Sequence, residues 1–278
     1  MKGRLLQVLE HAWRIRNARP AILALLDATA RGPLRSFWET QAPWHVGKLV
    51  ERRGNVVHLD GCRLDVSSQT FSTFQRGCLW LSRHEEPERI AVTRYLNPAQ
   101  PVIELGASTG MLSCLINRRL DRPAAHVAVE ANPDLIPVIQ SNRALNGCSF
   151  EVVHAAVAYD RRSIGFAHGE DHLAGQADLQ VAVTERVATT TLRQLLDRRQ
   201  WDRATLVCDI EGMEIDLWRH EADTVAERIG CLIVELHEPI SGREAVQAFL
   251  DGVRARGFAL VWERSWTRVF RNTRWTAA

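Results

Sequence analysis

The sequence predicts an α/β protein in which a seven-stranded, mostly parallel sheet is covered by helices on both faces and follows an N-terminal helical and β-hairpin addition. From Pro101 onward, short apolar runs alternate with segments of helical periodicity, which is the order of strands and helices in a parallel sheet. The apolar runs are continuous, as expected of strands buried on both faces. A chain of 278 residues is long enough for one such domain with an addition.

The elements of the main domain follow from these patterns in order. We expect strands at residues 102–105, 126–130, 150–155, 206–210 and 232–237. Helices are expected at residues 111–120, 133–146, 191–199, 214–229 and 243–256. A closing antiparallel hairpin, built from residues 258–262 and 268–270, would complete the seven strands.

Residues 1–97 are predicted to form the addition, and residues 98–278 the main domain. Leucine spacing predicts one or two helices over residues 1–31, with a break at Pro20. We interpret the addition as a cap on the main domain. The alternatives are a dimerisation arm, which would make the protein a homodimer, and part of a substrate lid.

Three further segments have their own signals. Alternating polarity around Asp60-Gly61 predicts a hairpin over residues 55–66, and residues 83–96 have helical spacing. Residues 163–187 contain two strand-like pieces, 164–167 and 181–187, around a polar stretch. The stretch holds His168, Asp171 and His172, which we interpret as a solvated loop near the ligand face; a lid that contacts the substrate is the alternative.

Composition argues against several classes of protein. The net charge is +2, and the arginines occur in scattered pairs, so we do not expect a nucleic-acid partner. The six cysteines form no C-x-x-C motif, which favours free thiols over a disulfide framework or a zinc site. No apolar run reaches the ~18 residues of a membrane span. Charged residues interrupt the N-terminus where a signal peptide would be apolar. We therefore expect a cytoplasmic protein.

The most informative stretch is the turn at residues 102–110, which reads Val-Ile-Glu-Leu-Gly-Ala-Ser-Thr-Gly. A strand, a tight turn and a helix start form a socket for a nucleotide-like ligand. About 20 residues later the second strand ends in Glu130, whose carboxylate can accept both hydroxyls of a ribose. The turn lacks the second glycine by which dinucleotide folds approach a pyrophosphate. A ligand with a ribose and no phosphates, such as S-adenosylmethionine, fits this pattern.

Residues at the strand ends predict the position of the site, because ligands of open α/β sheets bind beyond the carboxyl ends of the strands. Five strands end in polar or glycine-rich chemistry: Glu104 with the 106–110 turn, Glu130 with Asn132, residues 154–156, Asp209 with Glu211, and Glu235 with His237. Any one acid could instead cap a helix, and Asp209 or Glu211 could cap the helix that starts at Glu214. The set together predicts a binding site.

Several motifs occur in a fixed order along the chain. They are the 102–110 turn, Glu130-Ala-Asn-Pro133, Asn142-x-x-Leu-Asn-Gly147, Val152-Val-His-Ala-Ala156, Val187-Ala-Thr-Thr-Thr-Leu192, Asp209-Ile-Glu-Gly212 and Glu235-Leu-His237. In this order and spacing the chain resembles the FkbM family of S-adenosylmethionine-dependent methyltransferases, over roughly residues 86–238. The resemblance implies a class I methyltransferase (Rossmann-like) fold. It also implies O-methylation of a hydroxyl on a small-molecule or glycan acceptor, either a saccharide or a glycosylated natural product.

The chain departs from the family pattern at four positions. The family's turn usually reads Asp-x-Gly-Ala-Asn-x-Gly, whereas this chain has Glu104 in place of the acid and Ser108 in place of the asparagine. His154 stands where the family commonly has asparagine, and Ala131 where it commonly has proline.

The resemblance also implies roles for the strand-end residues. The turn would bind the methionine portion of the cofactor through Glu104, Gly106, Ala107, Ser108 and Gly110. Glu130 would hold the ribose, and Asn132 would lie beside the adenosine. His154 and Ala155 would lie near the adenine. Asp209 would lie beside the cofactor's ammonium group or the acceptor.

Methyl transfer to a hydroxyl needs an oriented acceptor and a base. His237 is our first candidate for the base, and Glu211 the second. We expect Glu235 and His237 to face opposite sides of the predicted strand, so that Glu235 could orient His237 only indirectly. In the alternative, Asp209, Glu211 and His237 hold a divalent cation, Mg²⁺ or Mn²⁺, that polarises the hydroxyl. His237 could also simply close its strand with a hydrogen bond.

Two other functions stay open. An NAD-dependent oxidoreductase would also use Glu130 on a ribose, but the missing phosphate-binding glycine and the Asp209-x-Glu-Gly element count against it. A non-catalytic module that senses adenosylmethionine would bind its ligand without needing His237 or Glu211. Among the aromatic residues of the addition, Trp38, Trp44 and Trp80 can stack on sugars, but this spacing is more typical of a core.

Overall fold

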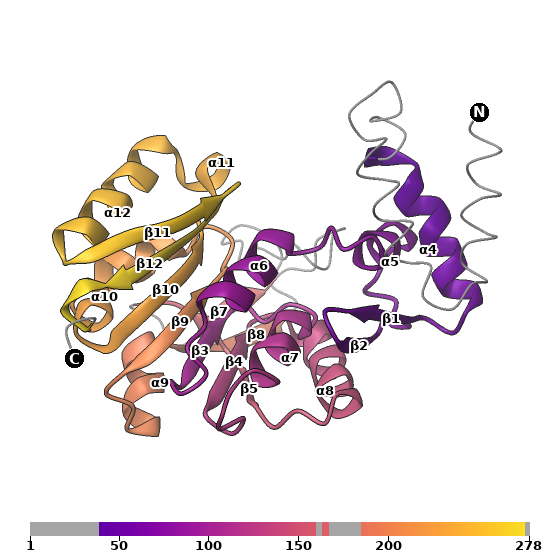
Figure 1. The fold of residues 1–278 in the computed structure, drawn as a ribbon, viewed down its shortest axis with the longest axis horizontal. Helices are drawn as coiled ribbons and strands as arrows, with labels where there is room; N and C mark the ends of the chain where they lie inside the picture. The colour runs from indigo at the N-terminus through magenta and orange to yellow at the C-terminus, as the bar shows by residue number, and fades with distance from the viewer. Residues whose placement is uncertain (1–38, 160–162, 167–184, 276–278) are drawn as a thin grey trace. The chain divides into compact units, whose positions relative to one another are not determined.

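The computed structural model describes residues 39–159, 163–166 and 185–275 of the chain (Figure 1). The chain divides into two compact units, Met1–His84 and Glu85–Ala278, which we describe separately. The helices predicted over residues 1–31, Trp38, and the stretch with His168, Asp171 and His172 lie outside the described residues.

In the first unit two helices pack on each other beside a hairpin. The elements are α4 (Ala42–Arg52), β1 (Val56–Leu59), β2 (Cys62–Asp65) and α5 (Thr73–Trp80). The predicted hairpin is confirmed: Asp60 and Gly61 both have positive φ, as a type I′ turn requires, and Leu59 pairs with Cys62. Helix α4 can approach α5 closely because Gly47 has no side chain: a Cβ there would lie 1.7 Å from the carbonyl oxygen of Thr73.

The second unit is built on the predicted seven-stranded sheet, in the order β11-β12-β10-β9-β3-β4-β5. These strands are β3 (Val102–Leu105), β4 (His126–Glu130), β5 (Glu151–His154), β9 (Ala204–Cys208), β10 (Ile229–Glu235), β11 (Phe258–Arg264) and β12 (Thr267–Asn272). The strands from β10 to β5 run parallel, and β12 is antiparallel to both of its neighbours. This is the topology of the class I methyltransferase (Rossmann-like) fold.

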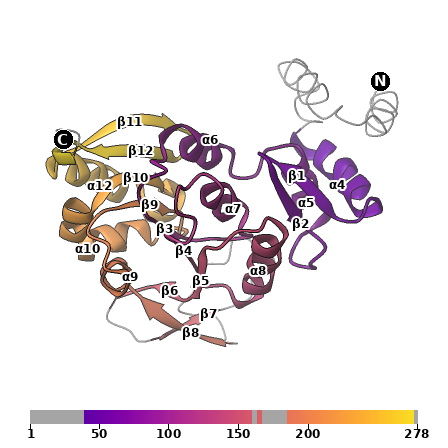
Figure 2. The same cartoon turned by 60° about the horizontal axis from the view of Figure 1, so that its bottom comes forward.

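Helices cover both faces of the sheet, as the continuous apolar strands predict (Figure 2). One face carries α6 (Glu86–Tyr95), α7 (Met111–Asn117) and α8 (Ile136–Leu145), and the other carries α9 (Leu192–Arg199), α10 (Glu214–Arg228) and α12 (Arg243–Ala255). The core between α9, α10, α12 and the sheet is aliphatic and aromatic, with Leu105, Leu206, Leu232, Phe249 and Phe270 all buried. Burying each such side chain stabilises the fold by about 1.5–3 kcal/mol.

Smaller elements complete the second unit. A three-stranded sheet joins β6 (Ala156–Val157), β8 (Glu185–Thr190) and β7 (Ser163–Phe166), where the sequence predicts two strand-like pieces. The short helices are η1 (Pro133–Leu135), α11 (Glu238–Ser241) and η2 (Thr273–Trp275). All six cysteines are free, as predicted, and Cys114, Cys208 and Cys231 are buried. Within the described part of the chain, no helix has the length and apolar character needed to cross a membrane.

Strands β9 and β10 are displaced from their predicted positions toward the N-terminus. They begin at Ala204 and Ile229 and end at Cys208 and Glu235, whereas the sequence predicts strands at residues 206–210 and 232–237. The residues that follow each strand bend out of the sheet. This displacement matters because the candidate site residues lie at these strand ends.

Candidate active site

The glycine turn follows β3, which lies beside β9 in the sheet. The chain adds β4 and β5 on one side of β3 and then returns to add β9 on the other side. Ligands of such sheets bind at this switch point. Gly106 has a φ of +85°, and a Cβ there would lie 1.7 Å from the carbonyl oxygen of Asp209. The amide of Asp209 in turn donates to the carbonyl of Leu105 at 2.9 Å. Glycine at position 106 therefore lets the turn and the end of β9 come into direct contact.

Glu130, at the end of β4, holds this turn from the other side. Its Oε2 accepts a hydrogen bond from the amide of Ser108 at 2.8 Å, and its Oε1 accepts one from the amide of Asn132 at 2.7 Å. Burial raises the pKa of Glu130 to about 7, although the backbone hydrogen bonds lower it in part. Each carboxylate oxygen has a second lone pair, so Glu130 can still accept hydroxyl donors.

A third contact to the turn comes from Asn142 of α8. This side chain is fully buried, and its Nδ2 donates to the carbonyl oxygen of Thr109 at 2.9 Å. Sequence reasoning placed Asn142 in a motif but gave it no role. The amide therefore links α8 to the turn that precedes α7.

Glu104 lies within β3 rather than beyond the carboxyl end of the strand. Its side chain is 1% exposed, and its Oε2 is 3.0 Å from Nε2 of His126 on the neighbouring strand β4. Burial raises the pKa of Glu104, while the hydrogen bond and the charge of His126 oppose this. From this position Glu104 can support the turn that it precedes.

The other predicted cofactor residues gather around Glu130. His154 on β5 is paired with Glu130 in the sheet register, is exposed, and has its Nε2 3.2 Å from the carbonyl oxygen of Ala131. Ala155 donates its amide to the carbonyl of Glu130 at 3.0 Å. Asn132 is buried, and its Oδ1 caps η1 by accepting from the amide of Asp134 at 3.0 Å.

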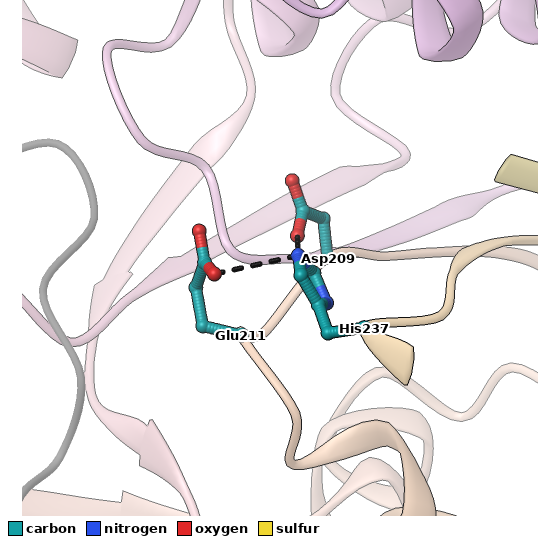
Figure 3. Close-up of side chains that lie close together, drawn as sticks. All are labelled: Asp209, Glu211 and His237. Carbon is teal, nitrogen blue, oxygen red and sulfur yellow. Dashed lines mark ion pairs between the residues drawn. The ribbon is translucent and has the colours of Figure 1, made fainter. Parts of the chain in front are cut away.

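Asp209, Glu211 and His237 form a compact cluster beyond the ends of β9 and β10 (Figure 3). Nε2 of His237 is 3.3 Å from Oε2 of Glu211 and 3.6 Å from Oδ1 of Asp209. One ligand atom from each residue lies within 4.8 Å of the others, so the three together could hold a metal ion. The sequence analysis groups these three residues only in its metal alternative, and the structure places their side chains close together.

The prediction that Glu235 and His237 face opposite sides is wrong. Oε2 of Glu235 lies 3.9 Å from Nε2 of His237, so both side chains point into the same cluster. In a strand, residues two apart lie on the same face, so the two-residue period itself places Glu235 and His237 on one side. His237 lies just beyond the end of β10, with φ of −83° and ψ of 76°.

Sequence reasoning missed Glu214, the first residue of α10. Its carboxylate accepts hydrogen bonds from the amides of Ile210 at 2.8 Å and Gly212 at 2.9 Å, and its Oε1 lies 3.4 Å from Nδ1 of His237. The N-cap of α10 is Met213, so the alternative in which Asp209 or Glu211 caps this helix does not hold. An acid at the start of a helix usually indicates an interaction with the helix dipole, so the sequence offered no reason to assign Glu214 another role.

The cluster holds its carboxyl groups in an environment that resists full ionisation. Burial raises the pKa of Asp209 well above its ordinary value, and the charges of Glu235 and Glu211 raise it further. Burial, with the charge of Glu88, raises the pKa of Glu235 to about 7. Burial lowers the pKa of His237, but the hydrogen bond and charge of Glu214 outweigh it, and the pKa is raised. A cation placed here would favour the ionised carboxylates.

Trp266, between β11 and β12, is an exposed aromatic residue beside this cluster. The side chain is 44% exposed, and its ring centroid lies 6.0 Å from that of the His237 ring. Its carbonyl oxygen accepts from the amide of Leu236 at 3.0 Å, which ties the hairpin to the end of β10. Sequence reasoning considered only tryptophans of the first 80 residues and did not consider Trp266.

Comparisons with known proteins give structural matches alone. No family model matches the sequence, and no curated protein matches it. A Streptococcus agalactiae protein of the NADB-Rossmann superfamily matches at 12% identity with a TM-score of 0.41, covering 66% of this chain and 67% of that one. A Streptococcus pneumoniae protein proposed to be a tRNA (m1A22) methyltransferase matches at 12% identity with a TM-score of 0.41, over 66% and 69% of the two chains.

A third solved structure is M. jannaschii TYW2 in complex with AdoMet. It matches at 15% identity with a TM-score of 0.36, covering 77% of this chain and 82% of that one. At these identities and scores, the fold of this chain is assigned from its own strand order, and its function must be argued from its own site.

Proposed function

We propose that the protein is an S-adenosylmethionine-dependent O-methyltransferase that acts on a hydroxyl of a saccharide or glycosylated natural product. One observation carries the proposal: the close approach of Gly106 to the carbonyl of Asp209 brings the glycine turn into contact with the strand end that carries the acid and imidazole groups. The socket for the cofactor therefore lies next to a cluster that can orient and deprotonate an acceptor. The motif order shared with the FkbM family supports the same function.

The cofactor-binding residues in this proposal lie along the carboxyl ends of β3, β4 and β5. The backbone of Gly106, Ala107, Ser108 and Gly110 binds the methionine portion, and Glu130 accepts the ribose hydroxyls. His154 and Ala155 border the adenine, with Asn132 shaping the adjacent wall. We assign this binding to residues 98–278 and treat residues 1–97 as the addition. A homodimer is a further proposal that the site itself does not require.

The catalytic part of the proposal concerns proton removal. When bound, adenosylmethionine supplies an electrophilic methyl group on a positively charged sulfur. The chain must hold the acceptor hydroxyl in line and accept its proton. His237 is the first candidate for this base through Nε2, and Glu211 the second. Asp209 lies between the turn and His237, where its carboxylate can attract the cofactor's ammonium group.

The class of acceptor is argued from the surroundings of His237. Trp266 exposes an aromatic surface beside the imidazole, and a sugar ring can lay its apolar C–H face on such a surface while its hydroxyls face polar groups. The carboxylates of Glu211 and Glu235 are natural acceptors for hydroxyl donors. These features favour a polyhydroxylated ring over a purely apolar acceptor.

A divalent cation is the alternative way to activate the hydroxyl. The ligand atoms of Asp209, Glu211 and His237 lie within 4.8 Å of one another, and two carboxylates with one imidazole would suit Mg²⁺ or Mn²⁺. In this version the three side chains would hold the cation, which would supply a Lewis acid for the hydroxyl, and His237 would be a ligand rather than the base.

Isothermal titration of the purified protein tests the cofactor. We expect S-adenosylmethionine and S-adenosylhomocysteine to bind and NAD not to bind, and we expect Glu130→Ala to lose binding of the first two. Binding of NAD alone, or of none of the three, would refute the methyltransferase proposal.

A radiolabelled methyl-transfer screen over glycans, glycosylated natural products and RNA then tests the acceptor, with and without Mg²⁺ or Mn²⁺. Turnover that is lost in His237→Ala, with adenosylmethionine binding intact, supports catalysis. A strict requirement for the cation would favour the metal alternative. Transfer of the label to RNA would contradict the proposed class of acceptor. A non-catalytic sensor protein would bind adenosylmethionine and would methylate no glycan, natural product or RNA in the screen.

A further inference from the structure

Two cysteines that are 34 residues apart in the sequence lie against each other in the second unit. Cys114 is in the middle of α7, and Cys148 lies between α8 and β5. The helices α7 and α8 pack side by side (Figure 2). Sγ of Cys148 lies 3.9 Å from the carbonyl oxygen of Cys114, and the Cys114 thiol also forms a hydrogen bond with Cys148. The two sulfur atoms are therefore neighbours.

The cap at the end of α8 fixes the backbone of Cys148. Gly147 has a φ of +62°, and the amide of Cys148 donates to the carbonyl of Arg143 at 3.0 Å. This is the Schellman arrangement, in which a glycine in the left-handed region ends a helix. Nδ2 of Asn146, in the same cap, donates to Sγ of Cys114 at 3.6 Å. The end of α8 therefore holds Cys148 beside Cys114.

Only one member of the pair can be reached by a reagent dissolved in water. All six cysteines lie in the described part of the chain. Cys148 and Cys78 are partly exposed, whereas the other four, Cys114 among them, are buried. A water-soluble oxidant should therefore meet Cys148 before it can meet Cys114.

The surrounding charges also favour reaction at Cys148, because the nucleophilic form of cysteine is the thiolate. The hydrogen bond with Cys114 lowers the pKa of Cys148, burial opposes this, and the charges of Arg118 and Arg143 lower the pKa further. For Cys78, by contrast, burial raises the pKa to about 11. Of the two partly exposed cysteines, Cys148 is therefore the better nucleophile at neutral pH.

We propose that Cys114 and Cys148 form an oxidisable dithiol, which a peroxide converts into an intramolecular disulfide between α7 and the segment after α8. The Cys148 thiolate attacks one oxygen of hydrogen peroxide and becomes a sulfenic acid, while the other oxygen leaves and takes up the proton that the thiol lost. The Cys114 thiol then attacks the sulfenic sulfur, the S–S bond forms, and the hydroxyl leaves with the thiol proton as a second water. Two thiols are oxidised and one peroxide is reduced. The reaction needs neither adenosylmethionine nor an acceptor, so it is independent of the proposed methyl transfer.

The disulfide would lie one helical turn from the glycine turn of the candidate site. The amide of Cys114 donates to the carbonyl of Gly110 at 3.0 Å, and Asn142 of α8 donates to the carbonyl of Thr109. The cross-link would therefore join the helix that begins at the glycine turn to the end of the helix that already contacts this turn.

Mass mapping of the full wild-type chain tests the pairing. The reduced protein is treated with hydrogen peroxide, blocked with N-ethylmaleimide in denaturant, and digested with trypsin without reduction. Trypsin places Cys114 in the peptide 95–118 and Cys148 in the peptide 144–161. In the monomer we expect these two peptides to be linked at least about tenfold more often than any other pair of cysteines, and dithiothreitol to release them. Oxidation of Cys148 to a sulfinic acid, its linkage to another cysteine or chain, or an unreacted Cys148 thiol would overturn the proposal.

Two variants then test the order of the steps, and the wild-type map stands whether or not they fold. Cys148→Ser should keep the Cys114 thiol under the same treatment, because the peroxide cannot reach a buried sulfur. Cys78→Ser is the matched control: it removes the other partly exposed cysteine and should form the Cys114–Cys148 link at the wild-type rate. Oxidation of Cys114 in Cys148→Ser at the wild-type rate, or loss of the link in Cys78→Ser, would contradict the proposed order of attack.

Discussion

At the scale of single residues, Gly106 is where one added methyl group should matter most. Its Cβ would lie 1.7 Å from the carbonyl oxygen of Asp209, in a backbone conformation with φ of +85° that side chains rarely adopt. Overpacking costs about 1–3 kcal/mol and left-handed strain about 1–2 kcal/mol, so Gly106→Ala should lower the free energy of unfolding by ~2–5 kcal/mol. We also expect adenosylmethionine affinity to fall by more than about tenfold in isothermal titration, since the turn must move.

Gly147→Ala is the control for this substitution. Gly147 also has positive φ, +62°, but no atom lies within 4 Å of its added Cβ. Backbone strain alone should lower the free energy of unfolding of this variant by about 1–2 kcal/mol, and its affinity for adenosylmethionine should stay that of the wild type. Equal effects of the two substitutions in urea denaturation and titration would mean that contact with Asp209 is unimportant.

The titration of Glu130 gives a prediction for cofactor binding. Its pKa is raised to about 7, and ribose hydroxyls would donate to the ionised form. Binding of S-adenosylhomocysteine should therefore strengthen as pH rises, with a dissociation constant about tenfold lower at pH 8 than at pH 6. Glu130→Gln should bind more weakly and lose this part of the pH dependence. A wild-type profile in Glu130→Gln would assign the dependence to other groups.

The ionisation of Glu130 also makes the free energy of unfolding depend on pH, and the direction of this dependence follows from its raised pKa. The folded state retains the Glu130 proton up to about pH 7, whereas the unfolded chain releases it near the ordinary value of 4.5. Between these values the folded state binds more protons, so this contribution is fully present below pH 4.5 and is lost as pH rises toward 7. Urea denaturation should show a decline of up to ~3 kcal/mol over this window, which Glu130→Gln should flatten.

At the scale of elements, the Thr-Thr-Leu sequence before α9 has a local structural explanation. Thr191 is the N-cap of α9: its Oγ1 accepts from the amide of Gln194 at 3.2 Å, and the Gln194 side chain accepts from the amide of Thr191 at 3.1 Å. Thr191→Ala should lower the free energy of unfolding by about 1 kcal/mol in urea denaturation, with unchanged adenosylmethionine affinity.

Ser72→Ala removes the equivalent capping box of α5 in the first unit and serves as the comparison. Both variants should lose similar stability, because both remove the same kind of hydrogen bond, from the amide of the third helical residue to the N-cap hydroxyl. Loss of cofactor affinity in Thr191→Ala without loss of stability would show that this threonine has a direct role in the site.

Periodicity was enough to predict the sheet, its helices and the edge that carries the candidate site. Short apolar runs that alternate with helical segments, such as residues 126–129, indicate strands buried on both faces, and polar residues such as Glu130 mark where the strands end. The pairing of Glu104 with His126 was not predictable, because it depends on the register between β3 and β4, which the apolar pattern does not fix. The shared side of Glu235 and His237 was predictable, because residues two apart in a strand lie on one face.

At the scale of the whole molecule, all proposed cofactor contacts belong to the second unit, Glu85–Ala278. Helix α6 belongs to it as well. The side chain of Thr267 donates to Glu88, Arg264 donates to Glu86 at 3.0 Å, and Arg271 donates to the carbonyl of Tyr95. Ala91 and Val92 of the same helix are fully buried. The sheet face under α6 therefore depends on residues before the predicted boundary at residue 98.

Two fragments test this dependence. Residues 85–278 should fold and bind S-adenosylmethionine within about threefold of the full chain, because every proposed contact is retained. Residues 98–278 lack α6 and should lose at least about 3 kcal/mol, since buried apolar surface is exposed and the partners of Thr267 and Arg271 are removed. Urea denaturation and isothermal titration of both fragments measure this difference. Binding by the shorter fragment alone would place the boundary at residue 98, and binding by neither would assign part of the cofactor site to the first unit.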